Sequence, residues 1–226
     1  MTSNGELLFA KAIVLGEGET EVQALPIFCQ QHWGLTPVES GLSFVDAKGC
    51  GNYYPFVALA EAFQIPWYIF SDGEKDTKKG LKKLLKRTYN EDKELAEQNN
   101  IFIISPEKDF EGMLLDDGYK DEIEKAIEQL KGEGYIDEFI RKFNHKPKGR
   151  EQTPNICKSC NQHIFVDIER IYDGEDGRLT ALDDIMEKNK AQLGPVLANC
   201  IIESEKPLPP LVVKLFDGIK KDICHV

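Results

Sequence analysis

Residues 12–21 read AIVLGEGETE, an apolar run that passes directly into a glycine turn carrying three glutamates. A short apolar run of this kind predicts a buried strand of a parallel sheet, and the residues after it lie at the carboxyl edge of that sheet. In open α/β sheets, ligands bind at this edge. The stretch therefore predicts an α/β fold with an acidic site at the end of its first strand.

The same pattern recurs at residues 65–74, IPWYIFSDGE, where a second apolar run ends in Asp72-Gly73-Glu74. Two acidic clusters at one sheet edge repel each other, at a cost on the order of 4 kcal/mol for each carboxylate pair about 4 Å apart at an effective dielectric near 20. A divalent cation removes that penalty, and oxygen ligands suit Mg²⁺ or Mn²⁺. We therefore expect a metal site between the two clusters.

Apolar runs and helical patterns alternate along the first half of the chain. Strands are predicted at residues 11–15, 42–46, 65–70 and 101–104, and helices between them at 19–32, 53–63 and 75–97. This alternation predicts right-handed crossovers and a parallel sheet with helices on both faces. Further helices are predicted at 121–130, 135–143, 179–193 and 211–223, and a long polar loop or insertion at 144–162. We expect a catalytic core at 1–115, a mostly helical elaboration at 116–200, and a C-terminal segment at 201–226 that packs back on the core.

Composition narrows the class of protein. The chain has 226 residues, a net charge of -11 and six scattered cysteines. This charge argues against a basic nucleic-acid binder, but not against an enzyme that meets phosphates through metal ions. No apolar stretch approaches 18 residues, so we expect a soluble cytoplasmic protein without membrane contact.

One segment, residues 75–87, carries seven basic residues against one acid. Its leucines supply a helical apolar stripe, so the lysines lie on the opposite face. A solvated helix face is one interpretation. The other is a track for the DNA backbone beside the metals, formed by Lys78, Lys82 and Lys86.

Three motifs together resemble the Toprim domain: Glu17-Gly18-x-Thr20-Glu21, Gly49-x-Gly51-Asn52 and Asp72-Gly73-Glu74. More narrowly, the chain resembles the nuclease half of the OLD (overcoming lysogenization defect) family, which includes the GajA anti-phage nuclease. Asp109-Phe110-Glu111 and Lys206-Pro207 match two later motifs, and the resemblance spans about residues 9–216. Glu74 stands where many Toprim proteins have aspartate.

The resemblance implies a Toprim α/β fold and a divalent-metal-dependent endonuclease or nickase that cleaves DNA with two Mg²⁺ or Mn²⁺ ions, in phage defence or DNA processing. The implied metal ligands are Glu17, Glu21, Asp72, Glu74, Asp109 and Glu111, with Asp72 bridging the two ions and Glu107 as a substitute in register. Glu17, Asp72 and Lys206 are the implied catalytic residues, the lysine stabilising the phosphate or protonating the leaving oxygen. From the residues alone, acids in a first helical turn are also ordinary partners of the helix dipole.

Several alternatives stay open. Another Toprim phosphoryl-transfer enzyme acting on RNA or DNA is one, and a non-catalytic module that docks an ATPase is another. The family normally carries an ATPase domain in the same polypeptide, but no Gly-x4-Gly-Lys-Ser/Thr motif occurs here. We therefore expect an excised C-terminal half or a standalone relative, with a homodimer as one option.

A Cys-x2-Cys pair, Cys157 and Cys160, is half of a zinc ribbon. Structural zinc needs four ligands, and the sequence offers no second such pair. Zinc is therefore not expected, and a loop with two reduced cysteines is favoured.

Overall fold

A parallel four-stranded sheet forms the centre of the protein in the computed structural model, which describes residues 4–157, 159–160 and 162–223. The strand order is β2-β1-β3-β4, and all three pairings are parallel, as the sequence predicted. The strands are β1 (Ala12–Gly16), β2 (Leu42–Asp46), β3 (Trp67–Ser71) and β4 (Ile101–Ile103). Every residue of β1 and β3 is buried, which explains their continuous apolar runs.

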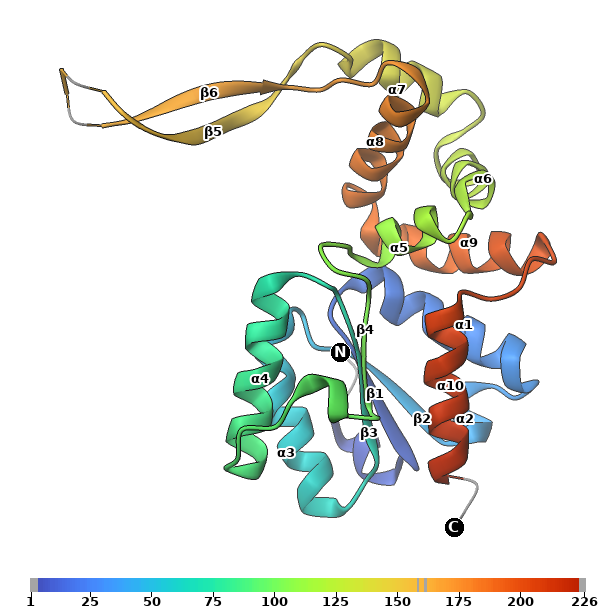
Figure 1. The fold of residues 1–226 in the computed structure, drawn as a ribbon. Helices are drawn as coiled ribbons and strands as arrows, with labels where there is room; N and C mark the ends of the chain where they lie inside the picture. The colour runs from blue at the N-terminus through green and yellow to red at the C-terminus, as the bar shows by residue number, and fades with distance from the viewer. Residues whose placement is uncertain (1–3, 158, 161, 224–226) are drawn as a thin grey trace.

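Helices cover both faces of this sheet (Figure 1). One face carries α1 (Glu19–Trp33), α2 (Pro37–Ser40) and α10 (Pro210–Ile223), and the other carries α3 (Tyr53–Phe63) and α4 (Lys75–Tyr89). Each face has its own apolar core. Short 3-10 helices occur at η1 (Asn4–Phe9), η2 (Cys50–Asn52) and η3 (Leu95–Glu97). β2 follows β1 in the chain and lies on one side of it, whereas β3 lies on the other side of β1. The strand order therefore reverses between β1 and β3, and such sheets bind ligands at this switch point.

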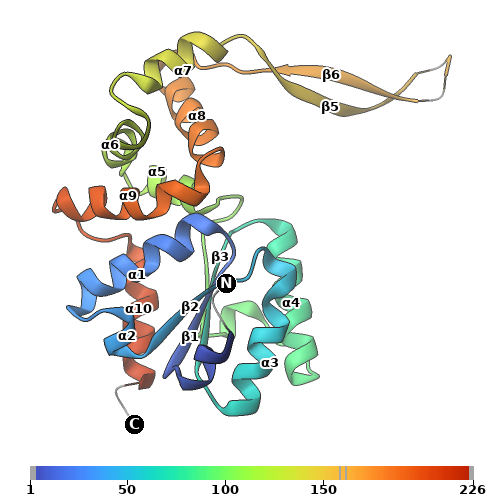
Figure 2. The same ribbon diagram turned by 180° about the vertical axis from the view of Figure 1, so that it is seen from behind.

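A second group of helices lies above the carboxyl edge of the sheet (Figures 1 and 2). It comprises α5 (Phe110–Asp116), α6 (Lys120–Lys131), α7 (Tyr135–Phe143), α8 (Gly174–Glu187) and α9 (Lys190–Glu203). Its apolar residues belong to the same core as those of α1 and α10. Gly194 of α9 packs against the backbone of Thr20, where an added Cβ would lie 2.5 Å from the carbonyl oxygen. This close approach seats α9 on the first turn of α1.

Residues 144–162, predicted as a long polar loop or insertion, are not a loop for much of their length. The chain instead forms an antiparallel hairpin from β5 (Pro147–Ile156) and β6 (His163–Glu169), which projects away from the helices (Figure 2). Both strands are exposed on both faces, so they lack the alternation of buried and exposed residues that marks most strands in a sequence.

Two predicted helix boundaries also differ. The helix predicted at 75–97 ends at Tyr89, because Asn90 adopts the left-handed conformation with φ of 56° and caps it. The single helix predicted at 179–193 is two helices, because the chain breaks at Asn189, whose amide donates to the Ile185 carbonyl at 2.6 Å. The second of them, α9, begins at Lys190.

No helix in the described part of the chain is both long and apolar enough to cross a membrane. Among the described residues the free cysteines are Cys29, Cys50, Cys157, Cys160 and Cys200. Cys224 lies outside the described residues.

Candidate metal centre

The carboxylate of Glu17 joins the two predicted acidic clusters. Glu17 follows β1, and the hydroxyl of Ser71, the last residue of β3, donates to it at 2.8 Å. The Thr77 hydroxyl of α4 donates at 3.2 Å, and the backbone N–H groups of Cys50 and Asp72 donate at 3.3 and 3.4 Å. Glu17 is therefore fixed at the carboxyl edge between β1 and β3, in the orientation that its four donors dictate.

The turn after β3 lies against the loop that follows β4. The Gly73 N–H donates to the Lys108 carbonyl at 2.8 Å. A Cβ at Gly73 would lie 1.9 Å from the Ser105 carbonyl oxygen, so only glycine fits this approach. Because the two segments touch here, Asp109 lies near enough to Asp72 for its charge to help raise the pKa of Asp72.

A buried pair of glutamates lies on the other side of the cluster. Glu21, in the first turn of α1, is 5 % exposed and accepts from the Gly18 N–H. Glu111, in the first turn of α5, is 3 % exposed and accepts from the Thr20 hydroxyl at 2.7 Å. The first turns of two helices 91 residues apart thereby meet at this site.

Crowding of these acids changes their protonation. Burial raises the pKa of Asp72 to about 8, and the carboxylates of Glu21, Glu17, Asp109 and Glu111 add to the effect. Burial likewise raises the pKa of Glu21 to about 7, although the Gly18 N–H opposes it. Burial also raises the pKa of Glu111, against the bond from Thr20. Such a group of mutually repelling carboxylates is the environment that a cation stabilises.

Two charged residues of this site were missed from the sequence. Lys190, the first residue of α9, pairs with Glu187 at 2.7 Å. Burial disfavours its charge, but the bond to Glu187 and the nearby Glu111 and Asp109 outweigh burial and raise its pKa. Asp183 of α8 is the other: partial desolvation and the nearby Asp109 raise its pKa.

Residues 8–73 match the family model described as "Overcoming lysogenization defect protein-like, TOPRIM domain". This stretch is therefore similar in sequence to OLD-like TOPRIM domains. It contains β1 through β3, with Glu17, Glu21 and Asp72, which confirms the resemblance drawn from the sequence motifs.

Solved structures extend the likeness to nearly the whole chain. The C-terminal region of the Xanthomonas campestris pv. campestris OLD protein superposes with a TM-score of 0.65 at 18% identity, covering 98% of this chain and 97% of that one. The C-terminal region of the Burkholderia pseudomallei OLD protein gives a TM-score of 0.61 at 17% identity, with 95% and 99% covered. The fold is therefore that of OLD C-terminal regions, helical part included. Comparison with curated protein sequences finds no match.

Three residues predicted for the TOPRIM site lie apart from the cluster. Glu74 is exposed at the residue that caps the start of α4. Glu107 pairs at the surface with Lys75 at 3.5 Å. Lys206 lies in the connection from α9 to α10, where its ammonium contacts Glu122 at 2.9 Å and the Gly118 carbonyl at 3.0 Å. The structure thus brings together five of the six predicted ligands, but not the predicted lysine.

The donor set of the TOPRIM site fits divalent magnesium or manganese. It offers carboxylate oxygens alone, and burial together with mutual repulsion raises the pKa of Asp72, Glu21 and Glu111. Among the described residues, no three His, Cys, Asp or Glu side chains already surround one common point as ligands would. Glu17, Glu21 and Glu111 each accept hydrogen bonds from N–H or O–H donors, which orient the carboxylates and leave further lone pairs for an ion.

Lysines of α4 divide into two rows. Lys82 pairs with Glu94 and Lys86 with Asp92, each at 3.1 Å on the surface. The second row faces a cavity of about 390 Å³ that begins at Cys50 and Gly51 and is bordered by Lys83 and Arg87. The Arg87 guanidinium lies 3.5 Å from the centre of the Tyr54 ring.

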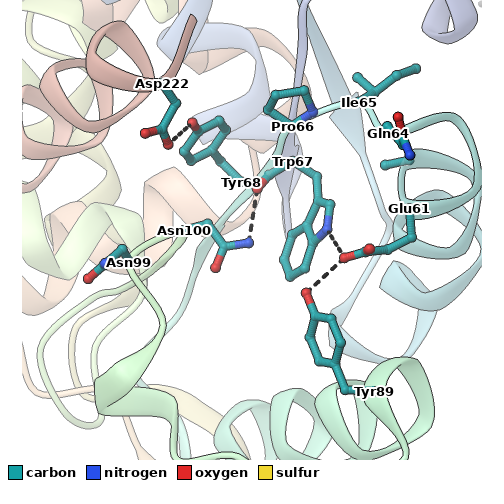
Figure 3. Close-up of a pocket in the computed structure, with 11 residues that line it drawn as sticks. Glu61, Gln64, Ile65, Pro66, Trp67, Tyr68, Tyr89, Asn99, Asn100 and Asp222 are labelled. Atoms are coloured by element: carbon teal, nitrogen blue, oxygen red, sulfur yellow. Dashed lines mark hydrogen bonds between the residues drawn. The ribbon is translucent and has the colours of Figure 1, made fainter. Parts of the chain in front are cut away.

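A further cavity, of about 480 Å³, lies at the amino end of β3 and so at the opposite edge of the sheet (Figure 3). Its polar side chains bind one another: Glu61 accepts from the Trp67 indole at 2.9 Å and from the Tyr89 hydroxyl at 2.8 Å. The Tyr68 hydroxyl donates to Asp222 of α10. These bonds join α3, α4 and α10 to β3. The residues that line the cavity therefore stabilise the fold and are not part of the TOPRIM site.

Proposed function

We propose that this chain is a divalent-metal-dependent DNA endonuclease or nickase, which hydrolyses phosphodiester bonds with two Mg²⁺ or Mn²⁺ ions. The observation that supports it best is the convergence of carboxylates from three separate segments at the switch point of a TOPRIM sheet. Lys190 of α9 interacts electrostatically with Glu111 and Asp109, and a single ammonium leaves most of this negative charge uncompensated.

Glu17, Glu21, Asp72, Asp109 and Glu111 would hold the ions. Bound there, the ions would stabilise negative charge on the scissile phosphate and lower the pKa of an attacking water. The chain itself positions the ligands: the four donors around Glu17 fix one carboxylate, and the Gly73 contact holds Asp72 against the β4–α5 loop.

Lys190 is the residue that we propose for phosphate charge stabilisation, in place of Lys206. Its ammonium couples to Glu111 and Asp109 and is held by Glu187, so it faces the cluster from α9. Lys206 is engaged instead by Glu122, which is 5 % exposed, at the far end of α9. A point cation beside the metal ligands suits a phosphate whose charge increases during transfer.

The cavity beside α4 gives the DNA backbone a path away from the carboxylates. It is lined by Cys50, whose N–H donates to Glu17, and by Tyr54, Lys83 and Arg87. Neither Lys83 nor Arg87 has an ion-pair partner among the described residues, so both cations are available to phosphates. Lys78, predicted from the sequence, lies on the same helix and stays part of the proposal.

Supercoiled plasmid tests this function directly. We expect the purified chain to convert it to nicked or linear DNA with Mg²⁺ or Mn²⁺, and EDTA to stop the reaction. Asp72→Asn should abolish cleavage, whereas Asp167→Asn, an exposed acid of the β5–β6 hairpin that pairs with Arg150, should leave it intact. Single-stranded RNA in a parallel reaction separates a DNA enzyme from another phosphoryl-transfer enzyme.

A docking module without catalysis is the competing function, and isothermal titration with Mn²⁺ separates it. The proposal expects binding that Asp72→Asn weakens by at least tenfold. Mn²⁺ binding that is absent, or indifferent to Asp72, would leave the acidic helices α6 and α7 as an interaction surface. If the nuclease assignment holds, plaque counts on cells expressing wild type or Asp72→Asn test the further proposal of a role in phage defence.

A further inference from the structure

The hairpin of β5 and β6 has no evident part in the TOPRIM site. It joins the body at its base, where the His145 N–H donates to the Arg170 carbonyl at 2.8 Å and Lys148 pairs with Asp184 at 2.7 Å. Beyond that base it projects freely (Figures 1 and 2). A two-stranded hairpin that is exposed on both faces is marginally stable in water at best. We therefore expect its free end to be stabilised by a contact that the described part of this chain does not provide.

The Cys157-x2-Cys160 pair occupies that free end. Cys157 directly follows β5, and its N–H donates to the Gln162 carbonyl at 2.8 Å, one residue before β6 begins. The Cys157 thiol lies 3.0 Å from the Ser159 hydroxyl, and both thiols are free. Two cysteines in one hairpin turn can supply two of the four thiolate ligands of a tetrahedral zinc site.

Local hydrogen bonds favour the thiolate at this turn. The Ser159 hydroxyl, the backbone N–H groups of Ser159 and Cys160 and the Cys160 thiol lower the pKa of Cys157 to about 6. Thiolate is the form that binds zinc.

The described residues of this chain do not supply the remaining two ligands. No third His, Cys, Asp or Glu among the described residues stands with Cys157 and Cys160 in a group that could hold a metal. His163 lies within β6, paired in register with Ile156. Cys29, Cys50 and Cys200 belong to the body of the protein, away from the hairpin. The described residues thus leave this half-site with two open ligand positions, which a second molecule can fill.

Apolar side chains next to the turn point to what that molecule is. Ile156, Ile164, Phe165 and Val166 are 51, 42, 55 and 48 % exposed, although each is large and apolar. In β6, Ile164 and Val166 share one face, with Phe165 on the other. Exposed apolar residues gathered beside a half-site mark a contact surface. A second copy of this hairpin offers the same apolar surface and the two missing thiolates, and a two-fold axis through the metal closes the assembly.

We propose that the hairpin turns of two copies of this chain share one structural Zn²⁺, bound by Cys157 and Cys160 of each copy. Ile164 and Val166, which share one face of β6, then pack across the two-fold axis. The sequence did not favour zinc because it offers one pair of cysteines, and the structure places that pair where a second copy can complete the site. This proposal is independent of the nuclease assignment, since its ligands and its readouts lie outside the TOPRIM site.

Zinc content and molecular mass test the proposal together. The whole chain is stripped with a chelator under reducing conditions, and zinc is then titrated in excess Mg²⁺, which occupies the carboxylate site. We expect 0.5 Zn²⁺ per chain and conversion from monomer to dimer in step with zinc, measured by elemental analysis and by light scattering after gel filtration. Cobalt in place of zinc should give the thiolate charge-transfer and tetrahedral d–d absorption bands of a four-sulfur site.

Matched serine variants assign the ligands. Cys157→Ser with Cys160→Ser should lose both zinc and the zinc-dependent dimer, with an unchanged thermal unfolding midpoint for the body. Cys200→Ser makes the same chemical change at a buried thiol outside the hairpin and should retain both. One zinc per monomer, a dimer that the double variant retains, or zinc content below a tenth per chain would each overturn the proposal. A Cys157–Cys160 disulfide that forms in preference to zinc under reducing conditions would overturn it as well.

Discussion

The Thr20 hydroxyl donates a hydrogen bond of 2.7 Å to the Glu111 carboxylate, and so joins the first turn of α1 to the first turn of α5. Both side chains are almost fully buried. The bond matters because Glu111 has a raised pKa, and a donor at Thr20 favours its charged form. Thr20 thus acts on the site through Glu111, as a positioning residue.

Thr20→Val keeps the shape of the side chain and removes this donor. We expect Mn²⁺ affinity and cleavage rate to fall by about 10- to 100-fold, the usual effect of losing a hydrogen bond behind a metal ligand. Titration calorimetry and plasmid nicking measure the two effects. Thr88→Val is the control, because the Thr88 hydroxyl bonds the Leu84 carbonyl within α4. Equal loss in both variants would mean that Thr20 contributes only to folding.

Asp72 should make the metal-free protein less stable as the pH rises. Its pKa is about 3.8 in an unfolded chain and about 8 in the fold, so the folded state holds its proton more tightly. The resulting stability is complete below pH 4 and is lost as the pH rises through 8. In EDTA, Asp72→Asn should therefore unfold at a temperature roughly 5 °C higher than wild type at pH 8.5. The difference should shrink toward pH 4.

Calorimetric scans from pH 4 to 9 measure this effect. Asp76→Asn is the control, because the pairing of Asp76 with Lys79 lowers its pKa and the group is fully exposed. Adding Mn²⁺ should make wild type unfold at a higher temperature than Asp72→Asn. The ion stabilises wild type by binding to the folded state, whereas the variant lacks one of its ligands. A variant that is less stable than wild type at pH 8.5 in EDTA would place Asp72 outside the crowded cluster.

Lys190→Ala should lower the turnover number by about 10²–10³, while metal and DNA affinity change little. Lys206→Ala provides the comparison at equal charge. From the structure we expect Lys206→Ala to leave turnover nearly intact and to destabilise the protein, because Glu122 loses its partner. Single-turnover cleavage and thermal unfolding separate the two lysines. The opposite result, with turnover lost only in Lys206→Ala, would restore the prediction made from the sequence.

Gly73→Ala should destabilise the protein by more than about 3 kcal/mol, because its Cβ would lie 1.9 Å from the Ser105 carbonyl oxygen. Gly51→Ala is matched in chemistry, and no atom lies within 4 Å of its added Cβ. Urea unfolding measures both changes. Similar midpoints for the two variants would show that the β3 turn does not touch the β4–α5 loop in solution.

The parts that the sequence predicted are those with a local signature. A strand buried on both faces, such as β1, must be apolar throughout, so its limits are visible in the residues. Glu17 and Asp72 follow such strands directly, and the parallel order of the sheet then brings them to one edge. The fold class and most of the ligands follow from these two facts.

The remaining parts depend on tertiary packing that leaves no local pattern. Lys190 faces the carboxylates only because α9 packs on α1, where Gly194 touches the Thr20 backbone. The Lys206 ammonium is engaged by Glu122, an ion pair between segments 84 residues apart. The β5–β6 hairpin has no buried face, so the hydrophobic pattern that reveals other strands is missing there.

The two rows of α4 should differ in their contribution to DNA binding. Lys83 and Arg87 border the cavity that starts beside Glu17, and neither is paired among the described residues. Lys82 and Lys86 are already neutralised in part by Glu94 and Asp92. Lys83→Glu with Arg87→Glu should weaken binding to a duplex by at least tenfold. The double variant should also reduce the slope of log affinity against log salt by about 1.8, at about 0.9 for each phosphate that the protein no longer neutralises.

Lys82→Glu with Lys86→Glu makes an identical change in charge on the neighbouring row, and we expect a clearly smaller reduction of the slope. Fluorescence anisotropy at several salt concentrations, in Ca²⁺ to prevent cleavage, measures both. An equal reduction in the two variants would favour the broad lysine face predicted from the sequence, with Lys78 as its first member. Unchanged slopes in both would make α4 a solvated helix and would move the DNA path to another surface, because the slope reports every phosphate that the protein neutralises, wherever it lies.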